Sequence, residues 1–454
     1  MSMKEYDVVV IGAGSAGQSV AAAAAKAGKT VAITEGREYG GTCPLRGCDP
    51  KLVLHAAAET MHRLHNLRGK GFTSDPDFSW PDLMEWKRSF TEPIPENSQE
   101  RMRENGVEVY ESYATFIDAH TLQLTDEVRI KGKTIVVATG LRPTPLDFPG
   151  SEYLYTSDDF LEMDELPGEM VIVGGGYIGT ETSQISHALG CRVTVIVSDD
   201  VPLSKFDHDL AGLLLTSAEE RGIKFHLNTR AKAIRKTGDR FEVDVEDKDG
   251  QQTTLTTDRV IHCAGRTPNI GELDLDAAGI EHDKKKGIVV DDRLRTNLPH
   301  VYAVGDCTDN GLPLSPVASY DATVLSEILF EGSDRKVEYY PLPTVAFSLP
   351  GMAAVGMTAD EAQKARKEGR KIAERFADAS DWYHARHLNS PVFAYKVFLD
   401  EDEDRILGAH LLGPDVTELI NLFYLAILQK TRVAELKKMI FAYPTPASTL
   451  KSML

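Results

Sequence analysis

The sequence predicts an α/β protein in which two doubly wound units precede a smaller α+β region. Two observations lead to this prediction. The order strand, glycine-rich turn, helix, strand occurs over residues 7–35 and returns over residues 170–197. Beyond about residue 340, amphipathic strands and helices continue without a glycine-rich turn. Short apolar runs that alternate with helices are typical of a parallel sheet with crossover helices.

The first unit begins with residues 7–11 (DVVVI), an apolar run suited to a buried parallel strand. Gly12, Gly14 and Gly17 follow, a helix is expected over 15–27, and a strand over 30–34 ends at Glu35. Such glycines permit a tight turn and close approach of a pyrophosphate to the helix N-terminus. An acid about 20 residues on can accept hydrogen bonds from a ribose. The order predicts a dinucleotide site; a merely tight turn is the alternative.

The second unit repeats this pattern. Residues 170–173 lead into Gly174, Gly176 and Gly179, and residues 179–197 align without gaps on residues 17–35. Two dinucleotide units in one chain predict two dinucleotides, one of which passes electrons to the other. A repeat that serves only the architecture is the alternative.

Further strands complete the two units. Residues 134–143 (TIVVATGLRP) and 259–269 (RVIHCAGRTPN) are apolar strands that end at a glycine, at matching places in each unit. Residues 300–307 (HVYAVGDC) form another strand, which places Asp306 on a turn. In the tail, residues 395–413 predict a hairpin around an acidic turn. Helices are expected over residues 418–429 and 433–439.

Composition excludes several classes of partner. The formal net charge of −19 would be repelled by nucleic acid and by an anionic membrane. No apolar run reaches the 18 or so residues of a membrane span. The Ala-rich start resembles a secretory signal, but cleavage after the alanines would discard the first glycine pattern. Five scattered cysteines are too few for a secreted disulfide framework, so we expect a cytoplasmic protein.

Cys43 and Cys48 stand five positions apart in GGTCPLRGCDPK. A structural disulfide, half of a metal site or a reactive pair would each explain this spacing. No further Cys or His completes a metal site nearby, and the histidines show no HxH or HExxH spacing, so no metal is expected. Cys191, Cys263 and Cys307 stand at strand ends, where packed small residues are expected.

Taken together, these segments resemble the FAD-dependent pyridine nucleotide–disulfide oxidoreductases, such as glutathione, dihydrolipoamide and mercuric reductases. The resemblance covers nearly the whole chain through the first glycine motif, GGTCPLRGCDP, ATGLRP, GGGYIGTE, CAGRTPN, YAVGDC and PLPTVAFSLPGMAAVGMT. It implies a FAD-binding domain over 1–147 and 289–336, and an NAD(P)-binding domain over 148–288. An interface or dimerisation domain over 337–454 would make the protein a homodimer.

The resemblance also assigns roles to residues. Gly12, Gly14, Gly17 and Glu35 would hold the adenosine part of FAD, and Asp306 its ribityl or pyrophosphate part. The same resemblance places a second group of residues at the two cofactors: Gly41, Thr42, Ala138, Thr139, Gly140, Gly174, Gly176, Gly179, Gly265 and Ala318. Tyr177 would lie over the flavin where nicotinamide enters.

In this family Cys43 and Cys48 match the redox disulfide. Cys48 would face the isoalloxazine and Cys43 the substrate. A hydride from NAD(P)H would reduce the flavin, which would reduce the disulfide. The Cys43 thiolate would then attack an outside acceptor, and Cys48 would resolve the mixed disulfide.

The first departure from the family lies near the C-terminus. Most members carry an active-site His-Pro-Thr, with a glutamate that holds the histidine. Here the segment reads AYPTPAS, so Tyr443 replaces the histidine and Ser448 stands where the glutamate would be. Tyrosine is a poor general base at neutral pH. Mercuric reductases also carry a tyrosine here, but this sequence has no cysteine after Cys307. Tyr443 is a catalytic candidate, and a packed aromatic residue at a subunit interface is the alternative.

Two further departures concern the cofactors. The family lysine that pairs with the glutamate at Glu181 would fall at Leu52; Lys51 is one residue earlier, about 100° around the helix. A Lys51–Glu181 pair and a solvated lysine are both possible. Val197 stands where the second unit should carry its ribose acid, and Asp199 and Asp200 follow. These acids would repel a 2′-phosphate, so NADH is slightly favoured over NADPH. An ordinary solvated turn is the alternative.

The sequence thus predicts an NAD(P)H-dependent reductase of a small-molecule or protein disulfide or another thiol-reactive acceptor. A mercuric-reductase-like or quinone-type electron donor is one alternative. A redox-sensing or carrier subunit that docks on a partner protein through its disulfide is another. The identity of the acceptor is not encoded in any motif of the chain.

Overall fold

The computed structural model describes residues 3–74, 76–125, 127–310 and 312–454. The chain forms two compact units. The first unit comprises residues 1–53, 84–145 and 265–338, and the second comprises residues 54–83, 146–264 and 339–454. None of the helices in this described part of the chain combines the length and apolar character that a membrane span needs.

The first unit contains a seven-stranded sheet in the order β3–β2–β1–β6–β5–β4, with β19 beside β6. Strands β3, β2, β1, β6 and β19 pair in parallel, whereas β5 and β4 are antiparallel. The bounds are β1 Met3–Ile11, β2 Val31–Glu35, β3 Glu108–Glu111, β4 Thr115–Phe116, β5 Thr121–Gln123, β6 Arg129–Val137 and β19 Val301–Ala303. The centre of the sheet is fully buried because Val9, Val10 and Ile135 have almost no exposed surface.

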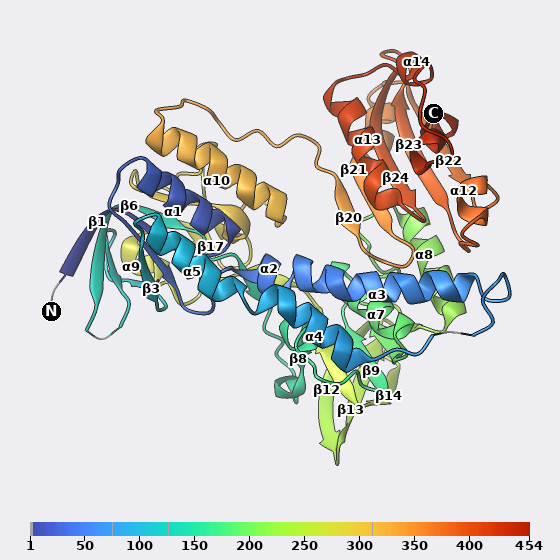
Figure 1. Cartoon of the computed structure of the whole chain (residues 1–454), viewed down its shortest axis with the longest axis horizontal. Coiled ribbons are helices and arrows are strands. Elements are labelled where there is room, and N and C mark those ends of the chain that lie inside the picture. The colour runs from blue at the N-terminus through green and yellow to red at the C-terminus, as the bar shows by residue number, and fades with distance from the viewer. Residues whose placement is uncertain (1–2, 75, 126, 311) are drawn as a thin grey trace. The chain divides into compact units, whose positions relative to one another are not determined.

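Helices α1 and α10 lie side by side in the first unit (Figure 1). Helix α1 buries a face of small residues, including Ala21 and Ala24, which allows close packing. The helices are α1 Ser15–Lys26, α2 Thr42–Arg46, α5 Ile94–Glu104, α9 Leu275–Ala278 and α10 Ser315–Phe330. Two more, α3 Cys48–Asn66 and α4 Trp80–Thr91, include residues of both units. Two-stranded sheets join β7 Leu141–Pro143 to β16 Arg266–Pro268, and β17 His282–Asp283 to β18 Gly287–Ile288.

The second unit contains a five-stranded parallel sheet in the order β11–β10–β9–β15–β8. Its strands are β8 Tyr155–Thr156, β9 Glu169–Val173, β10 Arg192–Ile196, β11 Lys224–His226 and β15 Arg259–His262. An antiparallel sheet follows with β12 Thr229–Thr237, β13 Arg240–Asp247 and β14 Gln252–Thr257. The helices here are α6 Ser157–Phe160, α7 Tyr177–Ala188 and α8 His208–Arg221.

The C-terminal part of the second unit is an antiparallel sheet in the order β20–β21–β24–β23–β22. Its elements are β20 Thr344–Ala346, β21 Met352–Gly356, α11 Ala359–Lys367, β22 Ile372–Asp378, α12 Tyr383–Arg386, β23 Ala394–Asp400, β24 Arg405–Leu412, α13 Val416–Leu428, α14 Val433–Leu436 and α15 Leu450–Met453. The predicted hairpin is confirmed, since β23 pairs with β24 around the acidic turn 401–404. The last predicted helix ends early, at Leu436, and Met439 and Ile440 beyond it are exposed.

These sheets confirm the predicted fold class. Both glycine-rich segments connect a parallel strand to a helix, and an α+β region with an antiparallel sheet follows them. The strand predicted over residues 300–307 is also present as β19, and Asp306 follows it in a 3₁₀ turn, Gly305–Cys307.

Candidate active site

The first glycine turn connects β1 to α1. Gly12 has φ of +102°, and a Cβ at this position would lie 2.4 Å from the Ala138 carbonyl oxygen. A Cβ at Gly17 would lie 1.9 Å from the Gly12 carbonyl oxygen. Only glycine permits this approach of helix to strand. The N-terminus of α1 therefore sits directly above the end of β1, where a pyrophosphate would meet free backbone N–H groups.

Glu35 ends strand β2 beside this turn. Its carboxylate accepts hydrogen bonds from the backbone N–H groups of Ala13 (2.9 Å) and Arg37 (3.0 Å). These bonds fix the carboxylate at the edge of the turn, which is where an acid that binds ribose stands in this fold.

The loop before the two cysteines rests on the same turn. Gly41 has φ of +79°, and a Cβ at Gly41 would lie 2.5 Å from the Cα of Gly14. Thr42 begins helix α2 immediately afterwards. The backbone of this loop therefore approaches the pyrophosphate turn as closely as two glycines allow.

Two segments predicted to match each other meet in the first unit. Strand β7 pairs antiparallel with β16. The N–H of Asn269 donates to the Gly140 carbonyl (2.9 Å), and the N–H of Thr144 donates to the Gly265 carbonyl (3.1 Å). The ends of the ATGLRP and AGRTPN motifs thus form one ribbon, which follows Thr139.

Asp306 lies in the 3₁₀ turn after β19. Burial raises the pKa of Asp306 to about 6, against the opposing charge of Arg266, and the charge of Asp321 raises it further. Asp321 is fully buried on α10 and accepts hydrogen bonds from Gly305 N–H (3.3 Å) and Asn310 Nδ2 (3.2 Å). Ala318, on the same helix, also packs against the turn, since a Cβ at Gly305 would lie 3.2 Å from its Cβ. The α10 helix therefore holds the turn that presents Asp306.

Cys43 and Cys48 are brought together as free thiols. Cys43 lies on α2, and Cys48 is the first residue of α3, where helix N-terminal N–H groups favour an anion. A hydrogen bond from Cys43 lowers the pKa of Cys48 to about 6, with help from Ser315 and Lys51 and against burial. The same bond, together with burial, raises the pKa of Cys43. The pair therefore carries a Cys48 thiolate and a Cys43 thiol at neutral pH.

The second glycine turn repeats the geometry of the first. Gly174 has φ of +116°, and a Cβ there would lie 2.4 Å from the Cys263 carbonyl oxygen. A Cβ at Gly179 would lie 1.9 Å from the Gly174 carbonyl oxygen. Gly176 faces open space, with nothing within 4 Å of an added Cβ. The two turns are built alike, which supports a second dinucleotide site.

The position that matches Glu35 in the second turn is apolar. Val197 is 2% exposed, and a Cβ at Gly175 would lie 2.8 Å from its Cγ atoms. Farther along, Asp199 accepts a hydrogen bond from Ser204 Oγ (2.6 Å). Asp200 pairs with His208 (3.1 Å) on the surface. A carboxylate is therefore available two residues beyond the expected position.

Tyr177 and Glu181 lie one turn apart on α7, and both bind the segment around β20. The Tyr177 hydroxyl hydrogen-bonds the Thr344 hydroxyl (2.5 Å), and burial raises the pKa of Tyr177. Glu181 is 8% exposed and accepts a hydrogen bond from the Phe347 backbone N–H (2.9 Å). Both side chains are held in fixed positions.

The C-terminal residues are arranged differently. Tyr443 is 80% exposed in this chain. Ser448 donates its hydroxyl proton to the Thr445 carbonyl (2.6 Å), so it is engaged within its own turn. The chain therefore supplies a phenol where relatives with His-Pro-Thr supply an imidazole.

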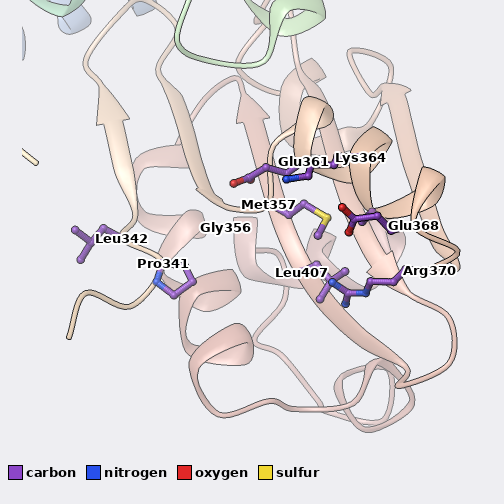
Figure 2. A pocket seen from close by; sticks show the side chains of 10 residues that line it. Pro341, Leu342, Gly356, Met357, Glu361, Lys364, Glu368, Arg370 and Leu407 are labelled. Atoms are coloured by element: carbon purple, nitrogen blue, oxygen red, sulfur yellow. The ribbon is translucent and has the colours of Figure 1, made fainter. Parts of the chain in front are cut away.

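Cys191 and Cys263 are buried residues of the second unit, which also contains the aromatic and basic segment 381–388 (DWYHARHL). Burial raises the pKa values of Cys191 and Cys263 to about 12, as expected for packed thiols. Tyr383 stacks on His387 in DWYHARHL. A separate pocket, formed by residues 341–342, β21, α11 and β24, is lined by Lys364 and Arg370 among others (Figure 2). It contains none of the predicted site residues.

Comparison with known proteins identifies the family. The model of the pyridine nucleotide–disulphide oxidoreductases matches residues 6–322, and the model of their dimerisation domain matches residues 342–454. This chain belongs to that family. It is a flavoprotein disulfide oxidoreductase with a dimerisation domain, as the motifs predict.

Relatives of this oxidoreductase are similar over almost their whole length. A dihydrolipoyl dehydrogenase of Haloferax volcanii is 32% identical over 98% of this chain and 94% of the relative, and one of Bacillus subtilis is 31% identical over 97% and 94%. The HOCl-induced flavoprotein disulfide reductase RclA of Escherichia coli has a similar structure, with a TM-score of 0.88, 26% identity and 99% coverage of both chains. A Cu(II) complex of an RclA mutant has the same TM-score, with 27% identity.

The family uses FAD and NAD(P)H, and the residues of this oxidoreductase fit FAD. The cradle at Gly12, Gly14 and Gly41 is too tight for a Cβ at two of these positions. Glu35 and the half-buried Asp306 supply carboxylates that suit the hydroxyl groups of ribose and ribityl. The donor set and the shape of the turn thus agree with a bound flavin dinucleotide.

Sequence reasoning missed two residues that the structure places at this site. Ser315 begins α10 with its Oγ 3.7 Å from Cys48 Sγ. Asp321 supports the Asp306 turn from the next part of the same helix. A carboxylate within the apolar run SPVASYDATVL was a signal for Asp321, because a buried charge needs partners. The Ser-Pro pair indicated a helix start but not what its hydroxyl contacts.

Proposed function

We propose that this oxidoreductase is a homodimeric disulfide reductase that transfers electrons from NAD(P)H through FAD to Cys43 and Cys48, and then to an external acceptor. The observation that carries the proposal is the pair of free cysteines itself, Cys43 hydrogen-bonded to Cys48 at the start of α3, which lowers the pKa of Cys48 and raises that of Cys43. The loop before the pair rests on Gly14 of the first glycine turn. The domain bounds predicted above are part of this proposal.

When bound, FAD supplies hydride acceptance and two-electron transfer to the cysteine pair. The chain's own residues would bind and orient it: the glycine turn brings the N-terminal N–H groups of α1 close to the pyrophosphate, and Glu35 and Asp306 would accept hydrogen bonds. Cys48 holds the negative charge of the reduced pair, and Cys43 holds the proton. Cys43 then forms the mixed disulfide with the acceptor, and Cys48 displaces it.

Two features narrow the substrates. Asp199 and Asp200 would repel a 2′-phosphate, which favours NADH over NADPH. Tyr443 is a weak acid–base group at neutral pH, which favours acceptors whose leaving group needs no proton. The charge of −19 disfavours nucleic acid and membrane partners, and the five scattered cysteines support action in the cytoplasm.

Reduction of a thiol-binding metal ion is a second candidate. Two observations favour it: Tyr443 replaces the acid–base histidine, and the similar protein RclA has been solved as a Cu(II) complex. A thiolate next to a thiol would suit a soft metal ion. A metal ion also needs no proton on departure.

A steady-state screen of the purified holoenzyme tests both candidates. NADH and NADPH are each combined with an aryl disulfide, glutathione disulfide, a quinone, Hg(II) or Cu(II), with Cys43→Ser as the matched variant. A disulfide reductase turns over the aryl disulfide and loses that activity in Cys43→Ser. Turnover of a metal ion alone favours the second candidate. Quinone turnover that survives in Cys43→Ser, with no disulfide turnover, would refute both.

A further inference from the structure

The reduced cysteine pair has a third polar neighbour from a distant part of the chain. Ser315 Oγ lies 3.7 Å from Cys48 Sγ, although 267 residues separate them. The same hydroxyl hydrogen-bonds the Cys43 sulfur, and Cys43 bonds Cys48. The three side chains therefore form a triangle in which each contacts the other two.

The charged groups around this triangle do not by themselves decide which sulfur is the anion. Lys51 favours a thiolate at Cys48, whereas Asp49 opposes one there. Asp49 also opposes a thiolate at Cys43. A thiolate can only accept hydrogen bonds, and the hydroxyl of serine can rotate toward either acceptor. Ser315 is thus the one neutral donor of the triangle that is able to serve both sulfurs.

We propose that Ser315 donates its hydrogen bond to the charged sulfur of the reduced pair and follows the charge from Cys48 to Cys43 before attack on the acceptor. The inference rests on the proposed function and deepens it. In this step the proton leaves Cys43 Sγ for Cys48 Sγ, which gives a Cys43 thiolate and a Cys48 thiol. Nothing is oxidised or reduced, and the total charge of the pair stays at one.

The moved proton reaches the leaving thiolate only after the S–S bond of the acceptor has broken, so it completes the exchange without the acid catalysis that a histidine would give to bond cleavage. The Cys43 thiolate attacks R–S–S–R′, a Cys43–S–S–R bond forms, and R′S⁻ leaves. The proton on Cys48 passes to R′S⁻, and the Cys48 thiolate attacks the Cys43 sulfur. The Cys43–Cys48 disulfide forms, and RS⁻ departs. In total, the singly charged enzyme dithiol and one acceptor disulfide are converted into the enzyme disulfide, R′SH and RS⁻.

The test compares Ser315→Ala, which removes the hydroxyl, with Ser315→Thr, which keeps it. Each holoenzyme is reduced anaerobically with NADH, and iodoacetamide alkylation of Cys43 and Cys48 is followed against pH by mass spectrometry. Ser315→Ala should raise the midpoint for Cys48 by about one to two pH units, the effect of one charge-assisted hydrogen bond. Ser315→Thr should stay within about half a unit of wild type. Ser319 is exposed and lies one turn farther along α10, so Ser319→Ala should leave the midpoints of both cysteines unchanged.

Catalysis provides a second readout. In Ser315→Ala, kcat/KM for an aryl disulfide should fall about tenfold or more, and Ser315→Thr should restore most of it. An unchanged Cys48 midpoint in Ser315→Ala, or a Ser315→Thr variant as defective as Ser315→Ala, would overturn the inference. Wild-type enzyme that gains no free thiols from NADH would instead overturn the proposed function. The two failures are therefore separable.

Discussion

Replacement of Gly41 by alanine should weaken the binding of FAD without unfolding the first unit. Gly41 has φ of +79°, and its added Cβ would stand 2.5 Å from the Cα of Gly14. Carbon atoms pack at about 3.5–4.0 Å, so one of the two loops must move by about 1 Å. Gly14 precedes the first residue of α1, and this displacement would pull the backbone N–H groups away from a pyrophosphate.

The size of the effect follows from a matched glycine. Gly28 has φ of +74°, but nothing lies within 4 Å of a Cβ there. Gly28→Ala and Gly41→Ala both place a Cβ on a residue with positive φ; at Gly41, where ψ is −172°, essentially only glycine adopts this backbone conformation, and the strain there is about 1–3 kcal/mol. Only Gly41→Ala adds the displacement. Loss of one hydrogen bond to a charged phosphate is worth about 1.5–3 kcal/mol, so FAD should bind about 10- to 100-fold more weakly than in Gly28→Ala.

The assay is titration of each apoprotein with FAD, followed by quenching of flavin fluorescence, with circular dichroism to confirm the fold. Equal dissociation constants for Gly41→Ala and Gly28→Ala would refute this reasoning. They would mean that the cysteine loop and the glycine turn do not form one cradle.

Three other predictions address pH, nucleotide choice and acceptor choice. Burial and the charge of Arg221, whose Nη1 lies 3.5 Å from the Nδ1 of the buried His62, lower the pKa of His62 to about 3. The imidazole of His62 is neutral in the folded protein. The contribution of His62 to the free energy of unfolding is therefore complete above the unfolded pKa near 6.5 and is lost as pH falls toward 3. At pH 5 this loss is about 2 kcal/mol. In urea titrations, His62→Asn should lose about 2 kcal/mol less between pH 8 and pH 5 than wild type, whereas His65→Asn at an exposed position should match wild type; equal losses in all three would count against the prediction. Wild type should show a higher kcat/KM with NADH than with NADPH, and Asp199→Arg should narrow the ratio by about tenfold or more; a wild-type preference for NADPH would be the contrary result. Aryl disulfides should turn over much faster than glutathione disulfide, because the Tyr443 phenol gives little of the 10²–10⁴-fold help of general acid catalysis; fast glutathione disulfide reduction, unchanged in Tyr443→Phe, would show that another group supplies the proton.

The sequence was sufficient for the features that depend on local chemistry. The turns after β1 and β9 begin at Gly12 and Gly174, whose positive φ only glycine adopts readily. The glycine in the sequence therefore predicts the turn directly. The sequence also showed that a valine, Val197, replaces the acid expected to bind ribose in the second unit. The structure places Val197 buried against the second glycine turn. These signals all come from residues within about 20 positions of one another.

The contacts that complete the site come from far along the chain and could not be predicted. Ser315 meets a cysteine 267 residues away, and Glu181 accepts a hydrogen bond from a backbone group 166 residues away. Hydrophobic periodicity states which face of a helix is buried but not what that face contacts. The sequence also defines helix ends poorly. Residues 437–439 are of types with high helix propensity, yet α14 ends at Leu436. Exposed Met439 shows that no core is there to continue the helix.

Anaerobic two-electron reduction of the holoenzyme is the most direct test of the claim that Cys43 and Cys48 are a redox pair at the flavin. The account predicts a long-wavelength charge-transfer band from the Cys48 thiolate to oxidised flavin. Because the pKa of Cys48 is about 6, the band should persist at neutral pH and fade only as pH falls through 6. Cys48→Ser should keep FAD and lose the band. Passage from oxidised to fully reduced flavin with no such band in the wild type would contradict the account.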